Sequence, residues 1–170
     1  MLARNEVIFK WVLYAAATAL CFLVQGALLQ RIVLLGVIPF LYPMLAAIPA
    51  TFEEPIPAGV FALCLGICCD LLLPEVIPCF YTLIFPVVGI CASLLSQGLL
   101  PAGFPCSLAV SAAAFLLTDL FRCFILALGS HHPWGAGLLI LLKEFLVTAP
   151  LLIPTTLLYG AVAHKVHTFD

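Results

Sequence analysis

Five charged residues stand inside otherwise uncharged, apolar stretches of this sequence, and they are its first candidates for chemistry. An ionisable side chain inside a membrane costs roughly a few kcal/mol, so each one needs a partner or a function. In such places, charges form ion pairs, proton relays or contacts with a ligand. The five residues are Asp70, Asp119, Arg122, Lys143 and Glu144.

The patterns of known catalytic and metal sites are missing. The sequence has no Gly-x-Ser-x-Gly, no His-Glu-x-x-His, no Gly-rich phosphate loop and no Asp cluster for Mg²⁺. Cys64, Cys68 and Cys69 have no second group of Cys or His that would complete a zinc site. We therefore expect no catalytic residue, no metal and no cofactor, and we interpret the eight cysteines as apolar packing residues.

The elements that must position the charges are membrane helices. Hydrophobic residues make up 65% of the 170, against six basic and eight acidic residues, and the mean hydropathy is +1.29. A bilayer core of about 30 Å needs roughly 20 helical residues. The uncharged stretches therefore predict an all-α integral membrane protein without a basic surface for nucleic acid. It would be one compact bundle of six transmembrane helices, near 11–29, 33–50, 56–73, 79–97, 105–128 and 137–162.

Basic residues outside the spans indicate the orientation. Six spans place both ends of the chain on one side of the membrane, and Arg4, Lys10 and Lys165 flank those ends. The opposite side has only Arg31 in a loop. The positive-inside rule then predicts that both termini are cytoplasmic.

The charges of the fifth and sixth predicted helices lie at one depth. These helices are antiparallel neighbours, and Arg122 precedes their short loop by about as many residues as Glu144 follows it. Arg122 and Glu144 are therefore a plausible ion pair. Asp119 and Lys143 are another. Such pairs would clamp the bundle, and contact with a partner or a ligand is the alternative.

The third predicted helix carries a stripe of small residues that ends in an acid. At about 100° per residue, four of its residues share one narrow face: Gly59, Ala62, Gly66 and Asp70. Small residues let another helix approach closely, and Asp70 would fix the register through a polar contact. The neighbouring helix belongs either to this chain or to another protein.

The last predicted helix has a polar face and two prolines. The polar residues that share a narrow sector are Glu144, Thr148, Thr155 and Tyr159. Such a sector needs a protein neighbour rather than lipid. Pro150 and Pro154 free backbone carbonyls and bend the helix, and a bend of this kind can line a cavity.

The order of these features resembles the rod-shape-determining protein MreD family, over about residues 8–165. The most specific part is the segment FEEPIPAGVFALCLGICCDLL, which follows in loose form an acidic-Pro pattern with two spaced glycines and a final Asp-Leu-Leu. The matching residues are Glu54, Gly59, Gly66, Asp70 and Leu71. In the last helix, an acidic residue followed by a polar residue and proline is matched by Glu144, Thr148 and Pro150.

The resemblance implies a non-enzymatic scaffold of the cell-elongation complex in the cytoplasmic (inner) membrane of rod-shaped bacteria. It would bind an MreC-type single-span protein. Through that protein it would work with MreB filaments and with the cell-wall synthases of lateral peptidoglycan synthesis. Contact would be helix against helix in the lipid bilayer, and a homodimer is a further option.

A second class of protein fits the same outline. The substrate-binding (S) subunit of an energy-coupling-factor vitamin transporter is also a compact six-helix protein, and Ala15 and Ala19 resemble the small-residue pair in the first helix of such subunits. Polar residues in the outer halves of three helices could surround a ligand. The outer loops are short and have few hydrogen-bonding groups, which favours the scaffold.

Overall fold

Helices form most of the described chain. The computed structural model describes residues 2–73, 78–98, 100, 103–129 and 134–167. The longer helices are α1 (Leu2–Ala27), α3 (Pro55–Leu72), α4 (Phe80–Gly98), α5 (Phe104–Gly129), α6 (Trp134–Thr148) and α7 (Leu152–His167). The shorter elements are α2 (Tyr42–Ala47) and the 3₁₀ turns η1 (Leu29–Arg31), η2 (Pro49–Phe52) and η3 (Ala149–Leu151). The side chains of Arg4 and Lys165, used above for the orientation, lie outside the described residues.

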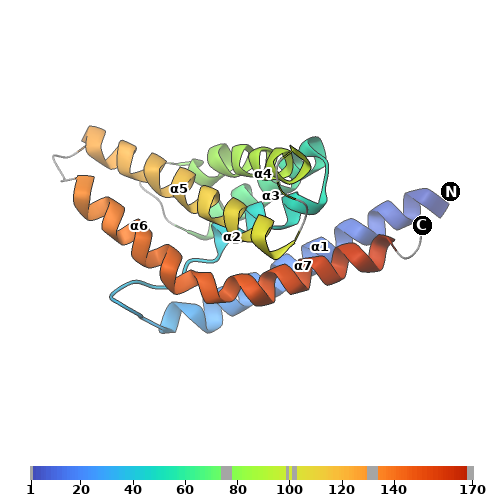
Figure 1. Cartoon of the computed structure of the whole chain (residues 1–170), viewed down its shortest axis with the longest axis horizontal. Coiled ribbons are helices and arrows are strands. Elements are labelled where there is room, and N and C mark those ends of the chain that lie inside the picture. The colour runs from blue at the N-terminus through green and yellow to red at the C-terminus, as the bar shows by residue number, and fades with distance from the viewer. Residues whose placement is uncertain (1, 74–77, 99, 101–102, 130–133, 168–170) are drawn as a thin grey trace.

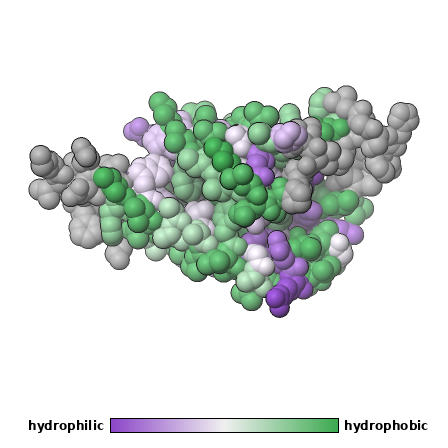
Figure 2. Space-filling model, turned by 180° about the vertical axis from the view of Figure 1, so that it is seen from behind, coloured by the Kyte–Doolittle hydropathy of each residue, from purple (hydrophilic) through white to green (hydrophobic). Residues whose placement is uncertain are grey.

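Five helical segments are long and apolar enough to cross a membrane, and they match five of the six predicted spans. The segments are Ile8–Arg31, Pro55–Leu72, Phe80–Gly98, Phe104–Ile125 and Leu139–His164. Large side chains on them, such as Leu23, Ile56 and Leu83, are exposed, and Figure 2 shows hydrophobic residues over most of one face. The chain is an all-helical, multi-pass membrane protein.

The predicted second helix, residues 33–50, is wrong over half of its length. Residues 32–41 are not helical, and only α2 and η2 supply helix in the second half. Figure 1 shows the non-helical part as a thin strap beyond the end of α1. An apolar stretch of suitable length is therefore not sufficient for a helical span.

The reason lies in the backbone of a tight hairpin within this strap. Leu34 and Val37 exchange two backbone hydrogen bonds of 2.9 and 3.0 Å. Between them, Leu35 and Gly36 have positive φ angles of 55° and 81°, which no right-handed helix contains. Pro39 then lacks the N–H that a helix would need. The turn and the proline together prevent an α-helix here.

The short helices α2 and η2, which follow the strap, return along the bundle inside a protein shell. Glu53, which follows η2, has its carboxylate 2.7 Å from Nζ of Lys10 in α1, whereas the strap begins at the far end of α1. Residues 41–51 are buried, and α2 and η2 pack against α4. Protein therefore covers the return path from residue 41 to residue 51, whereas most of the non-helical strap, residues 32–36 and 38, is exposed.

The Lys10–Glu53 ion pair offers a test of this return path. The Glu53 side chain is 8% exposed and that of Lys10 is 26% exposed. Lys10→Met therefore leaves the Glu53 carboxylate without its cation and with little access to water. We expect a loss of somewhat less than the roughly 3–5 kcal/mol of a fully buried pair. The double variant Lys10→Met/Glu53→Gln should recover much of this loss in thermal unfolding in detergent. A double variant no more stable than Lys10→Met would show that the pair does not hold the return path.

The last predicted span, 137–162, is a bent helix. Thr148 ends α6, and η3 with Pro150 follows before α7 begins. Proline removes a backbone donor and crowds the preceding turn, so the break occurs where the sequence predicts it. α7 packs antiparallel against α1, and both termini lie at one end of the bundle (Figure 1).

Candidate functional site

Polar side chains of α1, α3, α4, α5 and α6 form a network of hydrogen bonds and ion pairs. We call it the Asp70 network. It includes residues that the sequence predicts: Asp70, Asp119, Arg122 and Thr148. It also includes residues that the sequence analysis did not single out: Gln25, Phe40, Tyr81 and Thr82.

Asp70, near the end of α3, caps the start of α4. Its carboxylate accepts hydrogen bonds from the backbone N–H groups of Tyr81 (3.0 Å) and Thr82 (2.8 Å), and from the Thr82 hydroxyl (2.5 Å). The first N–H groups of a helix have no partner within the helix, and the helix dipole favours a negative charge there. Asp70 therefore satisfies backbone groups of another helix, which is its polar contact.

Two substitutions separate the charge of Asp70 from its hydrogen bonds. Asp70→Ala is expected to destabilise the protein by about 1–3 kcal/mol, because it leaves the N–H groups of α4 without an acceptor. Asp70→Asn keeps one acceptor oxygen and should lose less. Thermal unfolding in detergent measures both changes. Equal losses for the two variants would mean that the charge, rather than hydrogen bonding, gives Asp70 its effect.

The stripe of small residues on α3 packs against α4. A Cβ added to Gly66 would lie 2.6 Å from the carbonyl oxygen of Tyr81, and one added to Gly89 of α4 would lie 2.8 Å from Cβ of Ala62. Gly59 also faces a side chain of α4, at 3.0 Å. The two backbones are in close contact, so the stripe faces the interior of this bundle.

Arg122 of α5 is enclosed by aromatic side chains. Its Nη2 donates a hydrogen bond of 2.8 Å to the Tyr81 hydroxyl. Its guanidinium carbon lies 5.6 Å from the ring centre of Phe40 and 5.8 Å from that of Phe80. Both distances suit cation–π contacts. Arg122 therefore joins α5 to the start of α4 and to the end of the strap.

The ion pairs differ in part from the predicted ones. Arg122 lies 3.4 Å from Asp119, three residues earlier on the same helix face. Lys143 forms no ion pair within the described part of the chain, so the predicted pair of Asp119 with Lys143 is wrong. The local spacing on α5 gives Asp119 a nearer cation. The pairing of Arg122 with Glu144 stays a prediction.

Gln25 of α1 holds the backbone at the end of the strap. Its Nε2 donates to the carbonyl oxygen of Pro39 at 2.8 Å, and its Oε1 accepts from the N–H of Leu41 at 3.1 Å. Gln25 is 2% exposed, so neither bond competes with water. The amide thus replaces hydrogen bonds that a helix would have supplied.

Thr148, at the bend between α6 and α7, holds the same backbone from the other side. Its Oγ1 accepts from the N–H of Phe40 at 3.1 Å and donates to the carbonyl oxygen of Glu144 at 2.6 Å. Thr148 is fully buried. The strap is therefore fastened to both the first and the last long helical segment.

Sequence reasoning missed Gln25 and Tyr81 for different reasons. Gln25 is the one amide side chain inside the first predicted span, and the rule that a polar group in a membrane needs a partner would have found it. Tyr81 stands at a helix start among other aromatic residues, and no pattern separates it from them. Only the fold brings its hydroxyl to Arg122.

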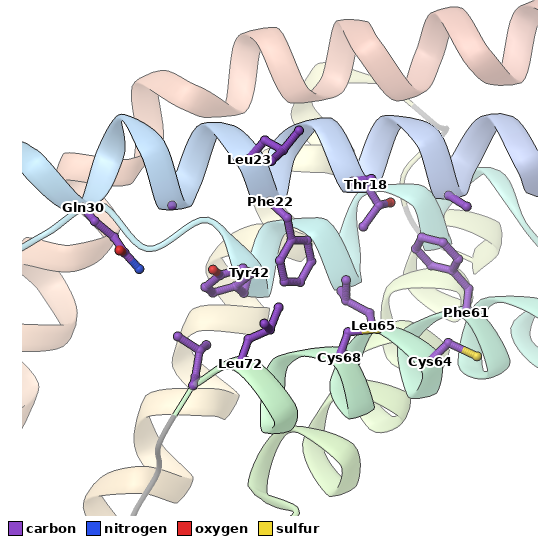
Figure 3. Close-up of a pocket in the computed structure, with 14 residues that line it drawn as sticks. Thr18, Phe22, Leu23, Gln30, Tyr42, Phe61, Cys64, Leu65, Cys68 and Leu72 are labelled. Atoms are coloured by element: carbon purple, nitrogen blue, oxygen red, sulfur yellow. The ribbon is translucent and has the colours of Figure 1, made fainter.

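Two adjoining clefts lie next to the network. The α1–α3 cleft, of about 730 Å³, lies between those helices and has mainly apolar walls, with Ala15, Ala19, Phe22, Leu65 and Cys68 among its lining residues (Figure 3). The Glu144 chamber, of about 590 Å³, lies against the strap, and its polar side chains include Gln25, Gln30 and Glu144. The two spaces adjoin each other, because three residues line both of them: Gln30, Tyr42 and Leu73.

The chemistry of this region is hydrogen bonding and ion pairing. Within the described residues, no three side chains of His, Cys, Asp or Glu gather to hold a metal ion. The network satisfies backbone groups, and the clefts leave space for an apolar occupant. No protein-family model matches the chain, and neither a curated protein nor a solved structure is similar enough to match it.

Proposed function

We propose that this protein is a non-enzymatic membrane scaffold of the bacterial cell-elongation complex. It binds an MreC-type single-span protein and supports cell shape and lateral peptidoglycan synthesis, with MreB filaments and cell-wall synthases as indirect partners. The proposed location is the cytoplasmic (inner) membrane. Both termini are cytoplasmic, and the strap with α2 and η2 provides a sixth crossing between α1 and α3.

The observation that carries this proposal is the close contact between α3 and the first turn of α4. Gly66 and Asp70 belong to the MreD-like pattern, and both meet the first turn of α4, through close packing and through capping. The resemblance therefore falls on residues that fix the shape of the bundle. A scaffold needs a fixed shape, and the apolar helices favour binding another helix within the membrane.

Co-purification from the native bacterium tests the proposal. The tagged protein is extracted in mild detergent, and its partners are identified by mass spectrometry, with an unrelated six-span protein of equal abundance as the control. We expect a single-span coiled-coil protein together with cell-wall synthases. Their absence from a sample that retains its other membrane partners would contradict the scaffold.

The clefts favour a second candidate, the substrate-binding subunit of an energy-coupling-factor transporter. Ala15 and Ala19, the pair that resembles such subunits, line the α1–α3 cleft, and the Glu144 chamber has the size of a small-molecule site. The same co-purification distinguishes the two candidates. Recovery of a paired ATPase with its membrane coupling subunit would favour the transporter.

A further inference from the structure

The two adjoining clefts change in polarity from one end to the other. Figure 3 shows α1 and α3 facing each other across the α1–α3 cleft, with Phe22 and Leu65 between them and Gln30 at one end. From Ala15 to Gly26, the α1 wall carries apolar and small side chains apart from Thr18, whose hydroxyl bonds within the protein. Gln30 also lines the Glu144 chamber, which adjoins this end of the cleft.

The change from apolar to polar walls along the clefts has the direction and the length of one lipid in one leaflet. Eleven residues of helix separate Ala15 from Gly26, which is about 16 Å at 1.5 Å per residue. One leaflet of the hydrocarbon core is about 15 Å thick. The polar chamber lies at the end of α1, where a head group belongs, and the apolar part extends toward the bilayer centre. A chain of a lipid would therefore lie along the cleft with its head in the chamber.

The charges at the chamber select the head group. Among the described residues, the chamber is lined by one acidic side chain, Glu144, and by no basic one; the guanidinium of Arg122 lies against the ring of Phe40, another lining residue. A carboxylate can accept several hydrogen bonds at once, so other contacts of Glu144 do not prevent one from a ligand. Arg31, the exposed last residue of η1, follows Gln30, which lines both clefts, and can supply a cation for a phosphate. A phosphate with a primary ammonium beyond it fits this order of charges.

We propose that the clefts bind one phospholipid of the surrounding leaflet whose head group carries a primary ammonium, as phosphatidylethanolamine does. Its acyl chain fills the α1–α3 cleft, and its ammonium reaches Glu144. This inference goes beyond the scaffold proposal and does not depend on it. The occupant is a lipid and not a partner helix, because the polar chamber adjoins the cleft and matches a charged head.

Native mass spectrometry of the purified, delipidated full-length protein tests the inference. Phosphatidylethanolamine and phosphatidylglycerol with identical acyl chains are added back in turn, and the bound lipids are counted. We expect one tightly bound phosphatidylethanolamine, with about tenfold preference over phosphatidylglycerol, the effect of about one charge-assisted hydrogen bond. Equal binding of the two lipids by the wild-type protein would overturn the head-group assignment.

Two matched pairs of variants locate the site. Ala19→Trp fills the α1–α3 cleft and should abolish retention, whereas Leu20→Trp, at the next and 53% exposed residue, should preserve it. Glu144→Gln should remove most of the preference between the two lipids, and Glu54→Gln, an exposed acid on another loop, should not. Gel filtration and thermal unfolding verify that each variant is folded.

The outcomes also distinguish a lipid from a partner helix as the occupant of the α1–α3 cleft. Equal lipid retention by folded Ala19→Trp and Leu20→Trp would place the lipid elsewhere and overturn the inference. Loss of a co-purifying single-span protein from Ala19→Trp, with lipid binding unchanged, would assign the cleft to a partner helix instead. Because the lipid measurement uses the purified protein alone, its failure leaves the scaffold proposal intact.

Discussion

Gly66→Leu should nearly abolish the folded protein. Even a Cβ at this position would lie 2.6 Å from the carbonyl oxygen of Tyr81 and 2.9 Å from Cα of Thr82, and backbone atoms of α4 cannot move aside as a flexible side chain can. Overpacking a core usually costs about 1–3 kcal/mol, and more where the backbone must shift. The shift would also pull the start of α4 away from Asp70. Accumulation in membranes and the monodisperse fraction on gel filtration measure the effect.

Gly98→Leu is the matched control. Gly98 ends α4, and a Cβ there would meet nothing within 4 Å, so the same change in size should be tolerated. Gly66→Ala should fall between the two, because it adds only the Cβ atom. A Gly66→Leu protein that accumulates like Gly98→Leu would contradict the close packing of α3 on α4.

The second large effect is expected for Gln25→Leu. The change keeps a side chain of similar volume but leaves the carbonyl oxygen of Pro39 and the N–H of Leu41 without their partner. Each buried polar group without a partner costs about 1–3 kcal/mol, so the expected loss is about 2–6 kcal/mol. The midpoint of thermal unfolding in detergent should fall accordingly.

Gln30→Leu tests whether the loss is specific to the strap. Gln30 is an exposed amide at the end of the same helical segment and bonds none of the strap residues that Gln25 holds. Its replacement should leave the unfolding midpoint nearly unchanged. Similar midpoints for the two variants would show that the hydrogen bonds of Gln25 do not stabilise the strap.

The helices whose stability depends on apolar length were predictable from the sequence. α3, α4 and α5 begin at residues 55, 80 and 104, each one residue from its predicted start. Glu54 precedes α3, Gly103 precedes α5 and Pro78 stands two residues before α4; α4 continues through Pro86 in its interior. In a membrane, a helix satisfies all of its own backbone groups, so length and polarity are enough to place it.

The segment between α1 and α3 could not be predicted in this way. Residues 33–50 have a suitable length and polarity, but Leu35 and Gly36 adopt left-handed backbone angles, and the hydrogen bonds that compensate come from Gln25 and Thr148. Those partners lie elsewhere in the sequence. A pattern within one segment contains no information about them.

The residues of the candidate site were easier to predict from the sequence than the contacts that they make. The spacing of Gly66 and Asp70 predicts one face in contact with a helix and a polar contact at its end; in the structure Gly66 packs on α4 and Asp70 caps it. The sequence does not identify the hydrogen-bond donors to Asp70. They are backbone N–H groups, which every residue except proline has. The sequence therefore indicates that Asp70 needs a partner without indicating which.

The fastening of the strap has a consequence for how the protein is made. Phe40 bonds Thr148, which the ribosome adds 108 residues later, while its neighbours bond Gln25 of the helix already made. Lipid offers no substitute partner for a bare peptide group. During synthesis the strap must therefore wait, in water or against the insertion machinery, until the end of α6 arrives. The strap, which is translated soon after α1, is thus among the last segments to form its hydrogen bonds.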